Sequence, residues 1–265
     1  MVSSWLRELD DVLRGRKADP RLLASGTTHI PIGPLAAMSV LLGVAYGICM
    51  GLYAVATRTP PSLMQMIAAA VKVPALFFLT LVVTFPSLYV FSALLGVRLT
   101  PKDTLRLILV PITINLGVLA SLATITAFFT LSTTSYPFMA LLNVFFFGVS
   151  GIIGLRVLLT MLSRLEEAQT PPAVLPPVPS LADGGGGPSQ PEPAQPTAAP
   201  RTRDRTAART TFQVWVVIYA LVGAQMGWIL RPFIGSPDIP FQWFRNREAN
   251  IFVDIAHTIA KLLGS

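Results

Sequence analysis

Five long runs of uncharged, mostly hydrophobic residues alternate with polar segments along the chain. One of them is residues 73–97, which lies between Lys72 and Arg98. As an α-helix rising about 1.5 Å per residue, such a run reaches about 37 Å and crosses a hydrocarbon core about 30 Å thick. The same pattern marks further spans at residues 35–56, 107–131, 138–155 and 212–230. The sequence therefore predicts an all-α fold, a polytopic membrane bundle of five transmembrane helices.

Amphipathic patterns near both ends of the chain predict helices that do not cross the membrane. In residues 2–17, apolar side chains recur at helical spacing opposite charged ones. This pattern fits a helix on the membrane surface and equally a helix packed on the protein. Residues 251–263 repeat it after an aromatic stretch typical of the water–lipid boundary. We therefore expect a cytoplasmic amphipathic segment at residues 1–33 and an extracytoplasmic interfacial tail at residues 232–265.

The segments between the predicted spans differ in composition. Residues 34–165 form a four-helix transmembrane region, in which the short apolar piece 63–71 is expected to lie along the membrane surface. Thr100-Pro101 suits a helix start, because threonine is a good N-cap and proline is tolerated at the first helical position. Residues 166–210 hold ten prolines and few large apolar side chains. They therefore predict a disordered cytoplasmic linker before the fifth helix at residues 211–231.

Glycines recur at helical spacing in three of the predicted spans. Small residues let the backbones of two membrane helices approach closely. We therefore expect helix packing at Gly43, Gly47, Gly51, Gly148, Gly151, Gly154, Gly223 and Gly227. The spacing favours packing within the chain, and homodimerisation is the alternative.

Four further residues stand out inside the spans: Pro86, Asn115, Asn143 and Gln225. Pro86 has no N–H and frees the carbonyl oxygen of Val82, for which a neighbouring helix or a hydroxyl of Thr84 or Ser87 is the expected donor. The amides have two interpretations. They make hydrogen bonds between helices, or they line a passive pore.

The composition excludes a soluble domain, and the distribution of the positive charge fits membrane topology better than nucleic-acid binding. The chain is 52% hydrophobic and 12% charged, with a net charge of +7. Most lysines and arginines fall in segments that are cytoplasmic if the N-terminus is cytoplasmic, as the positive-inside rule requires. This asymmetry explains the positive charge without nucleic acid. It predicts a C-terminus outside the cytoplasm, and the excess of arginine over lysine favours a bacterial cytoplasmic membrane.

The sequence offers no candidate for catalysis or metal binding. None of the acidic residues lies inside a predicted span, and His29 and His257 stand singly outside the spans. Cys49 is the only cysteine. No phosphate-binding loop, nucleophile elbow or zinc-protease motif occurs. We therefore expect no enzyme activity and no cofactor.

The layout resembles that of bacterial members of the Yip family, five-span membrane proteins whose eukaryotic relatives interact with Rab GTPases. The shared features are an amphipathic segment ending at Asp19-Pro20 and a passage in which Gly96 closes the second span before residues 104–111 open the third. Residues 108–110 differ from the usual Tyr-Ala pair, and the long linker is also atypical. The likeness covers about residues 5–165 and implies the five-span architecture.

These observations favour a non-enzymatic scaffold or accessory subunit that acts through contacts with membrane lipid and with a membrane-protein partner or a second copy. A passive channel or small-solute permease that uses Asn115 and Gln225 is the alternative.

Overall fold

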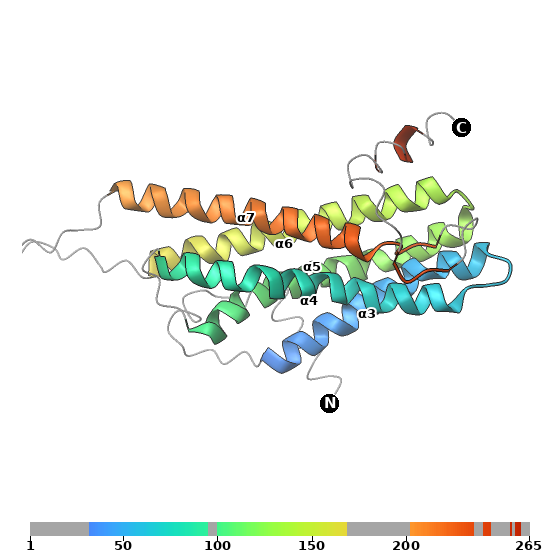
Figure 1. The fold of residues 1–265 in the computed structure, drawn as a ribbon, viewed down its shortest axis with the longest axis horizontal. Helices are drawn as coiled ribbons and strands as arrows, with labels where there is room; N and C mark the ends of the chain where they lie inside the picture. The colour runs from blue at the N-terminus through green and yellow to red at the C-terminus, as the bar shows by residue number, and fades with distance from the viewer. Residues whose placement is uncertain are drawn as a thin grey trace, which may run out of the picture.

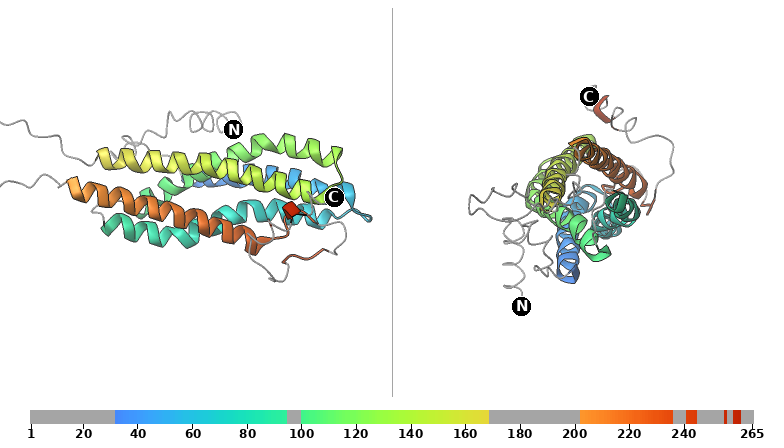
Figure 2. Two further views of the ribbon diagram at one scale, coloured as in Figure 1. Left: turned by 90° about the horizontal axis from the view of Figure 1, so that it is seen from above. Right: turned by 90° about the vertical axis from the view of Figure 1, so that its left-hand side faces the viewer.

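The computed structural model describes residues 32–94, 100–168, 202–235, 241–244, 255 and 258–260, and within them the regular structure is helical without strands. The five long helices are α3 (Ile32–Thr57), α4 (Leu63–Leu94), α5 (Pro101–Ser132), α6 (Tyr136–Ala168) and α7 (Thr202–Leu230). They lie side by side along the longest axis of the molecule, and each runs antiparallel to the one before it (Figures 1 and 2). The predicted terminal helix at residues 2–17 and most of the linker and tail lie outside the described residues.

The helices form a closed ring in the order α3, α4, α7, α6, α5. Helix α3 packs against α4 on one side and α5 on the other, and α7 packs against α4 and α6. The end-on view in Figure 2 shows this arrangement. The interior is filled by large side chains with little or no exposed surface, among them Tyr46, Tyr53, Leu88, Ile108 and Trp215.

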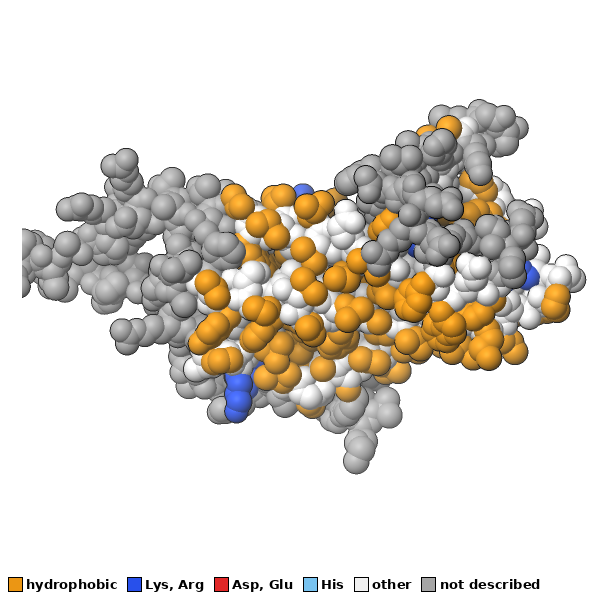
Figure 3. Space-filling view, in the orientation of Figure 1, with side chains coloured by type: hydrophobic (Ala, Val, Ile, Leu, Met, Phe, Trp, Pro, Cys, Tyr) orange, Lys and Arg blue, Asp and Glu red, His pale blue; other side chains and the backbone are white. Residues whose placement is uncertain are grey.

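Four of the helices are long and apolar enough to cross a membrane. Their candidate spans are Ile32–Thr57, Leu63–Val90, Pro101–Ser132 and Tyr136–Met161, whereas the apolar part of α7, Val214–Leu230, is shorter. Large apolar side chains such as Leu41, Val82 and Leu131 are exposed. Hydrophobic side chains spread over the length of the helical body in Figure 3, with few basic ones among them. This surface is the one that lipid tails require.

Helix α4 begins ten residues earlier than the predicted second span. Residues 63–71 were expected to lie outside the span, and this expectation is wrong, because α4 runs without a break from Leu63 through Lys72 and Pro74. The charge of Lys72 does not end the helix. Its side chain is 2% exposed and finds its partners inside the protein, as described below.

Helices α6 and α7 also extend beyond their predicted limits. Helix α6 continues to Ala168, so Arg156 lies within a helix and not at its end. Helix α7 starts at Thr202, inside the segment expected to be disordered. Both additions contain charged residues, and the predicted spans were ended at those charges.

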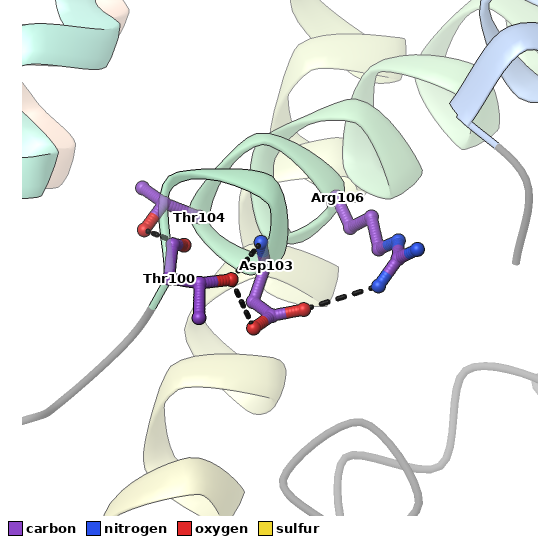
Figure 4. Close-up of polar contacts among 4 residues, drawn as sticks. All are labelled: Thr100, Asp103, Thr104 and Arg106. Carbon is purple, nitrogen blue, oxygen red and sulfur yellow. Dashed lines mark hydrogen bonds and ion pairs between the residues drawn. The ribbon is translucent and has the colours of Figure 1, made fainter. Parts of the chain in front are cut away.

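The predicted cap at the start of α5 is confirmed. The Thr100 hydroxyl accepts a hydrogen bond from the backbone N–H of Asp103 at 3.3 Å, and Pro101 occupies the first turn. The Asp103 carboxylate accepts from the Thr100 hydroxyl and from Arg106 Nη1, the latter at 3.1 Å (Figure 4). The negative charge also lies where the helix dipole favours it.

Replacing this cap should destabilise the fold. For Thr100→Ala we expect a loss of about 1 kcal/mol in the free energy of unfolding, because an N-terminal N–H loses its acceptor. Thr100→Ser keeps the hydroxyl and should lie close to the parent. Thermal unfolding of the purified protein in mild detergent measures both variants. Equal melting temperatures for Thr100→Ala and the parent would contradict the assignment.

Candidate functional site

Buried polar side chains link α3 to its neighbours. The hydroxyls of Ser39 on α3 and Thr113 on α5 are hydrogen-bonded at 2.8 Å. The Tyr46 hydroxyl donates to Oδ1 of Asn143 on α6 at 2.7 Å, and Asn143 Nδ2 donates to the Met139 carbonyl at 2.8 Å. Asn143, a predicted pore or packing residue, therefore joins two helices.

Two more hydrogen bonds join elements that are far apart in the sequence. The Tyr53 hydroxyl of α3 donates to the carbonyl oxygen of Thr134, in the turn between α5 and α6, at 2.6 Å. Trp215 Nε1 of α7 donates to the Ser87 hydroxyl of α4 at 2.9 Å. Each hydrogen bond gives the polar atom of a buried aromatic side chain a partner, which offsets the free-energy cost of removing that atom from water.

The glycine stripe of α3 lies directly against α4. A Cβ placed on Gly43 would be 3.1 Å from Pro74 Cβ, and one on Gly47 would be 2.5 Å from the Ala69 carbonyl oxygen. A Cβ on Gly51 would be 2.5 Å from Met66 Cα. The two backbones are therefore too close for a side chain at Gly47 and Gly51 and tightly packed at Gly43, and the stripe is used inside the chain.

The other predicted glycines divide into packed and open positions. A Cβ on Gly154 would lie 3.1 Å from Asn115 Cβ, and one on Gly227 would lie 3.4 Å from Leu76 Cδ1. Gly223 is more loosely packed, with Thr80 at 3.8 Å. Gly148 and Gly151 of α6 have no atom within 4 Å of the added Cβ. The predicted stripe on α6 thus packs only at Gly154.

The three predicted amides are not brought together. Asn143 bonds to Tyr46 in the interior, whereas Gln225 is exposed on α7. Asn115 lies beside Gly154, and its Oδ1 is buried without a hydrogen-bond partner. They form no common lining.

Pro86 lies inside α4, where it leaves the Val82 carbonyl without its helical donor. The neighbouring hydroxyls bond elsewhere: Thr84 donates to the Thr80 carbonyl at 2.7 Å, and Ser87 to the Thr84 carbonyl at 2.7 Å. Of the two expected kinds of donor for Val82, a neighbouring helix or one of these hydroxyls, the second is therefore wrong. Helical geometry gives these short side chains access to carbonyls three or four residues back in the sequence, and Val82 does not lie at that distance from Thr84 or Ser87.

A polar cluster that the sequence analysis missed lies where α7 ends. Lys72 Nζ of α4 donates to the Pro232 carbonyl at 3.0 Å and to the Trp243 carbonyl, and it lies 5.3 Å from the centre of the Phe244 ring. Gln65 Nε2 donates to the carbonyls of Pro232, at 3.2 Å, and Phe233, at 2.9 Å. We call Lys72, Gln65 and these three carbonyls the carbonyl cage.

The sequence did contain a signal for the cage. Lys72 is flanked by apolar residues on both sides, and residues 63–97 form one long apolar segment interrupted by this single charge. A lysine in such a place is a candidate for an internal partner. Among the described side chains the only carboxylate is that of Asp103, which is bonded at the start of α5, so the ammonium is held by carbonyl oxygens.

No metal-ligand cluster of histidine, cysteine, aspartate or glutamate occurs in the described part of the chain. No protein-family model matches the chain, and no curated protein or solved structure is significantly similar to it. The arrangement of the residues themselves is therefore the basis for the function proposed below.

The contrast between packed and open glycines can be tested with matched variants. Gly47→Ala should lower the free energy of unfolding by about 1–3 kcal/mol, because its Cβ would overlap the backbone of α4. Gly148→Ala should be neutral or stabilising by up to about 1 kcal/mol, since alanine favours the helix and meets no neighbour. Unfolding in detergent with increasing denaturant measures both. Equal effects would contradict the close α3–α4 contact.

Proposed function

We propose that this chain is a non-enzymatic integral membrane protein, a scaffold or accessory subunit that acts through lipid and protein contacts. One observation carries the proposal: the buried polar side chains of the described residues all have hydrogen-bond partners within the protein, some on their own helix and some on another element. Ser39, Tyr46, Asn143 and Lys72 all have partners on other elements. Reactive chemistry or selective transport needs polar groups that are free to meet a substrate.

We also propose five crossings of a bacterial cytoplasmic membrane, with the N-terminus in the cytoplasm and the C-terminus outside. The alternating direction of α3 to α7 supports this, because it puts the start of α3 and the end of α7 toward opposite ends of the bundle (Figure 1). Lys102 and Arg106 lie at the start of α5, on the end proposed to be cytoplasmic. The same five-span layout is what a Yip-like ancestry would produce.

The outer surface of α6 is our proposed contact region. Helix α6 is the least buried of the four long apolar helices. Gly148 is open on this surface, and the neighbouring Val144, Phe145 and Ile152 are exposed. A glycine beside large apolar side chains suits contact with another membrane helix, which a partner or a second copy would supply. Where no such helix is bound, lipid covers this surface of α6.

The competing proposal is a passive channel or small-solute permease. The unpartnered Oδ1 of Asn115 favours it, since a buried amide oxygen without a donor is available to a polar solute. Gln225, the other residue expected to serve a pore, is exposed on a different helix.

Native mass spectrometry from nanodiscs made directly from membranes tests the scaffold role. We expect complexes heavier than the 28.5 kDa chain. Gly148→Trp should reduce the heavier fraction at least fivefold by blocking close approach, whereas Val217→Trp on the exposed surface of α7 should not. A protein that is monomeric in every preparation would refute the proposal.

Proteoliposome flux separates the two functions. For a scaffold we expect vesicles that contain the protein to be as tight to small neutral solutes and ions as empty vesicles. Flux above that of empty vesicles, and lower in Asn115→Leu, would establish the channel instead. Gln225→Leu then serves as the second variant, since the pore interpretation requires both amides.

A further inference from the structure

Helix α7 ends beside the middle of α3 and beside the first third of α4, since Lys72 of α4 bonds to Pro232 just after α7. Pro74 meets Gly43 and Ala70 meets Gly47, so Lys72 lies level with the central part of α3 (Ile32–Thr57). From Gly47 to its end, α3 continues for about 15 Å. Figures 1 and 2 both show α7 ending short of the turns that join α3 to α4 and α5 to α6.

The chain after α7 continues along the same surface of α4. Ser87 bonds to Trp215, Thr80 and Leu76 lie against glycines of α7, and Lys72 and Gln65 bond to carbonyls of residues 232 and 233. These five residues of α4 are spaced by seven, four, four and seven positions, so they share one helical face. The segment 231–235 therefore extends the path of α7 toward the start of α4 without being helical.

Non-helical backbone at this depth needs donors from the protein, because lipid supplies none. Lys72 has three N–H groups. Two are used by the Pro232 and Trp243 carbonyls, and the ammonium also lies near the Phe244 ring. Gln65 supplies the remaining donor to Phe233. Together they donate to three carbonyls of the non-helical backbone, those of Pro232, Phe233 and Trp243.

The segment is packed as well as hydrogen-bonded. The Phe233 ring lies 6.3 Å from that of Phe147 on α6, and Ile234 is buried. A Cβ on Gly235 would be 2.9 Å from Gln65 Cγ and 3.3 Å from Ala54 Cβ. The segment thus fills the space between α4 and α6 beyond the end of α7.

We propose that the Lys72 ammonium is a tethered cation that binds the backbone carbonyls of the carbonyl cage and latches the non-helical residues 231–235 and 241–244 inside the bundle. The ligand class of the cage is a primary ammonium, here supplied by the chain itself. Discontinuous membrane helices use unwound carbonyls in this way to bind cations. The inference does not depend on the scaffold role, because it concerns only how the backbone after α7 is held against α4.

A disulfide between α3 and the latched segment reports whether the latch is closed. The Cβ atoms of Ala54 and of a residue at 235 would be 3.3 Å apart, close to disulfide geometry. The reporter is Ala54→Cys with Gly235→Cys in a full-length chain carrying Cys49→Ala. Loss of free thiols under mild oxidation, measured by gel shift with a maleimide polymer, gives the rate.

Removing the cation should open the latch. In the reporter, Lys72→Met should slow cross-linking at least tenfold, whereas the exposed Lys102→Met should not change it. In Lys72→Ala, added n-propylammonium replaces the missing part of the side chain and should restore the rate at least threefold. Tetramethylammonium has no N–H and should not restore the cross-linking rate.

Asp238→Asn, which removes the acidic residue nearest the cage in sequence, should cross-link like the parent.

Three results would overturn the proposal. Lys72→Met could cross-link as fast as the parent, which would show that the cation does not hold the segment. Asp238→Asn could slow cross-linking as much as Lys72→Met, which would assign the ammonium to a carboxylate. Finally, Lys72→Met in the natural chain could raise alkylation of the half-buried Cys49 tenfold. That result would show that Lys72 stabilises the packing of the whole bundle and not the latched segment alone. We expect Cys49 alkylation within twofold of the parent.

Discussion

A backbone carbonyl surrounded by hydrocarbon needs a donor from the protein, and this requirement is hardest to meet where α7 ends. Within α3 to α6 the helical hydrogen bonds meet it except where a proline removes a donor, as Pro86 does for Val82. Short hydroxyl side chains add a second donor to several carbonyls, as Thr80 does to Leu76 and Thr130 to Thr126. After Leu230 the helix no longer provides donors. Gln65 and Lys72 replace them, so the path of the chain beyond α7 depends on two side chains of α4.

Helix α4 can supply these donors to the backbone after α7 because its two sides have different neighbours. On one side Met66, Ala70 and Pro74 recur every four residues and meet the glycine stripe of α3. The backbones touch there, so that side has no room for a long side chain. Lys72 lies about 160° around the helix from Pro74 and faces the segment after α7. The glycines of α3 thus leave the opposite side of α4 to carry the polar residues that α7 needs.

The sequence predicted the parts of this fold that depend on one element at a time. Four long apolar helices and the Thr100 cap follow from local hydrophobicity and capping chemistry. The start of α4 was placed wrongly because a charge was taken as the end of a span, and only the tertiary structure supplies the carbonyls that hold Lys72. The same limit applies to the glycines: Gly47 and Gly148 have similar sequence contexts, but only the neighbouring helix decides which one is packed.

The length of α7 bears on the fifth membrane crossing that we propose. Its apolar part, Val214–Leu230, spans about 25 Å as a helix, about 5 Å less than a hydrocarbon core of about 30 Å. Extended backbone covers about 3.3 Å per residue, so two residues beyond the helix suffice to complete the path. Lys72 and Gln65 donate their hydrogen bonds to the second and third residues after the helix, Pro232 and Phe233. A crossing finished by non-helical backbone therefore needs a buried donor on a neighbouring helix, and a lone lysine within an apolar run is a sequence feature that can supply one.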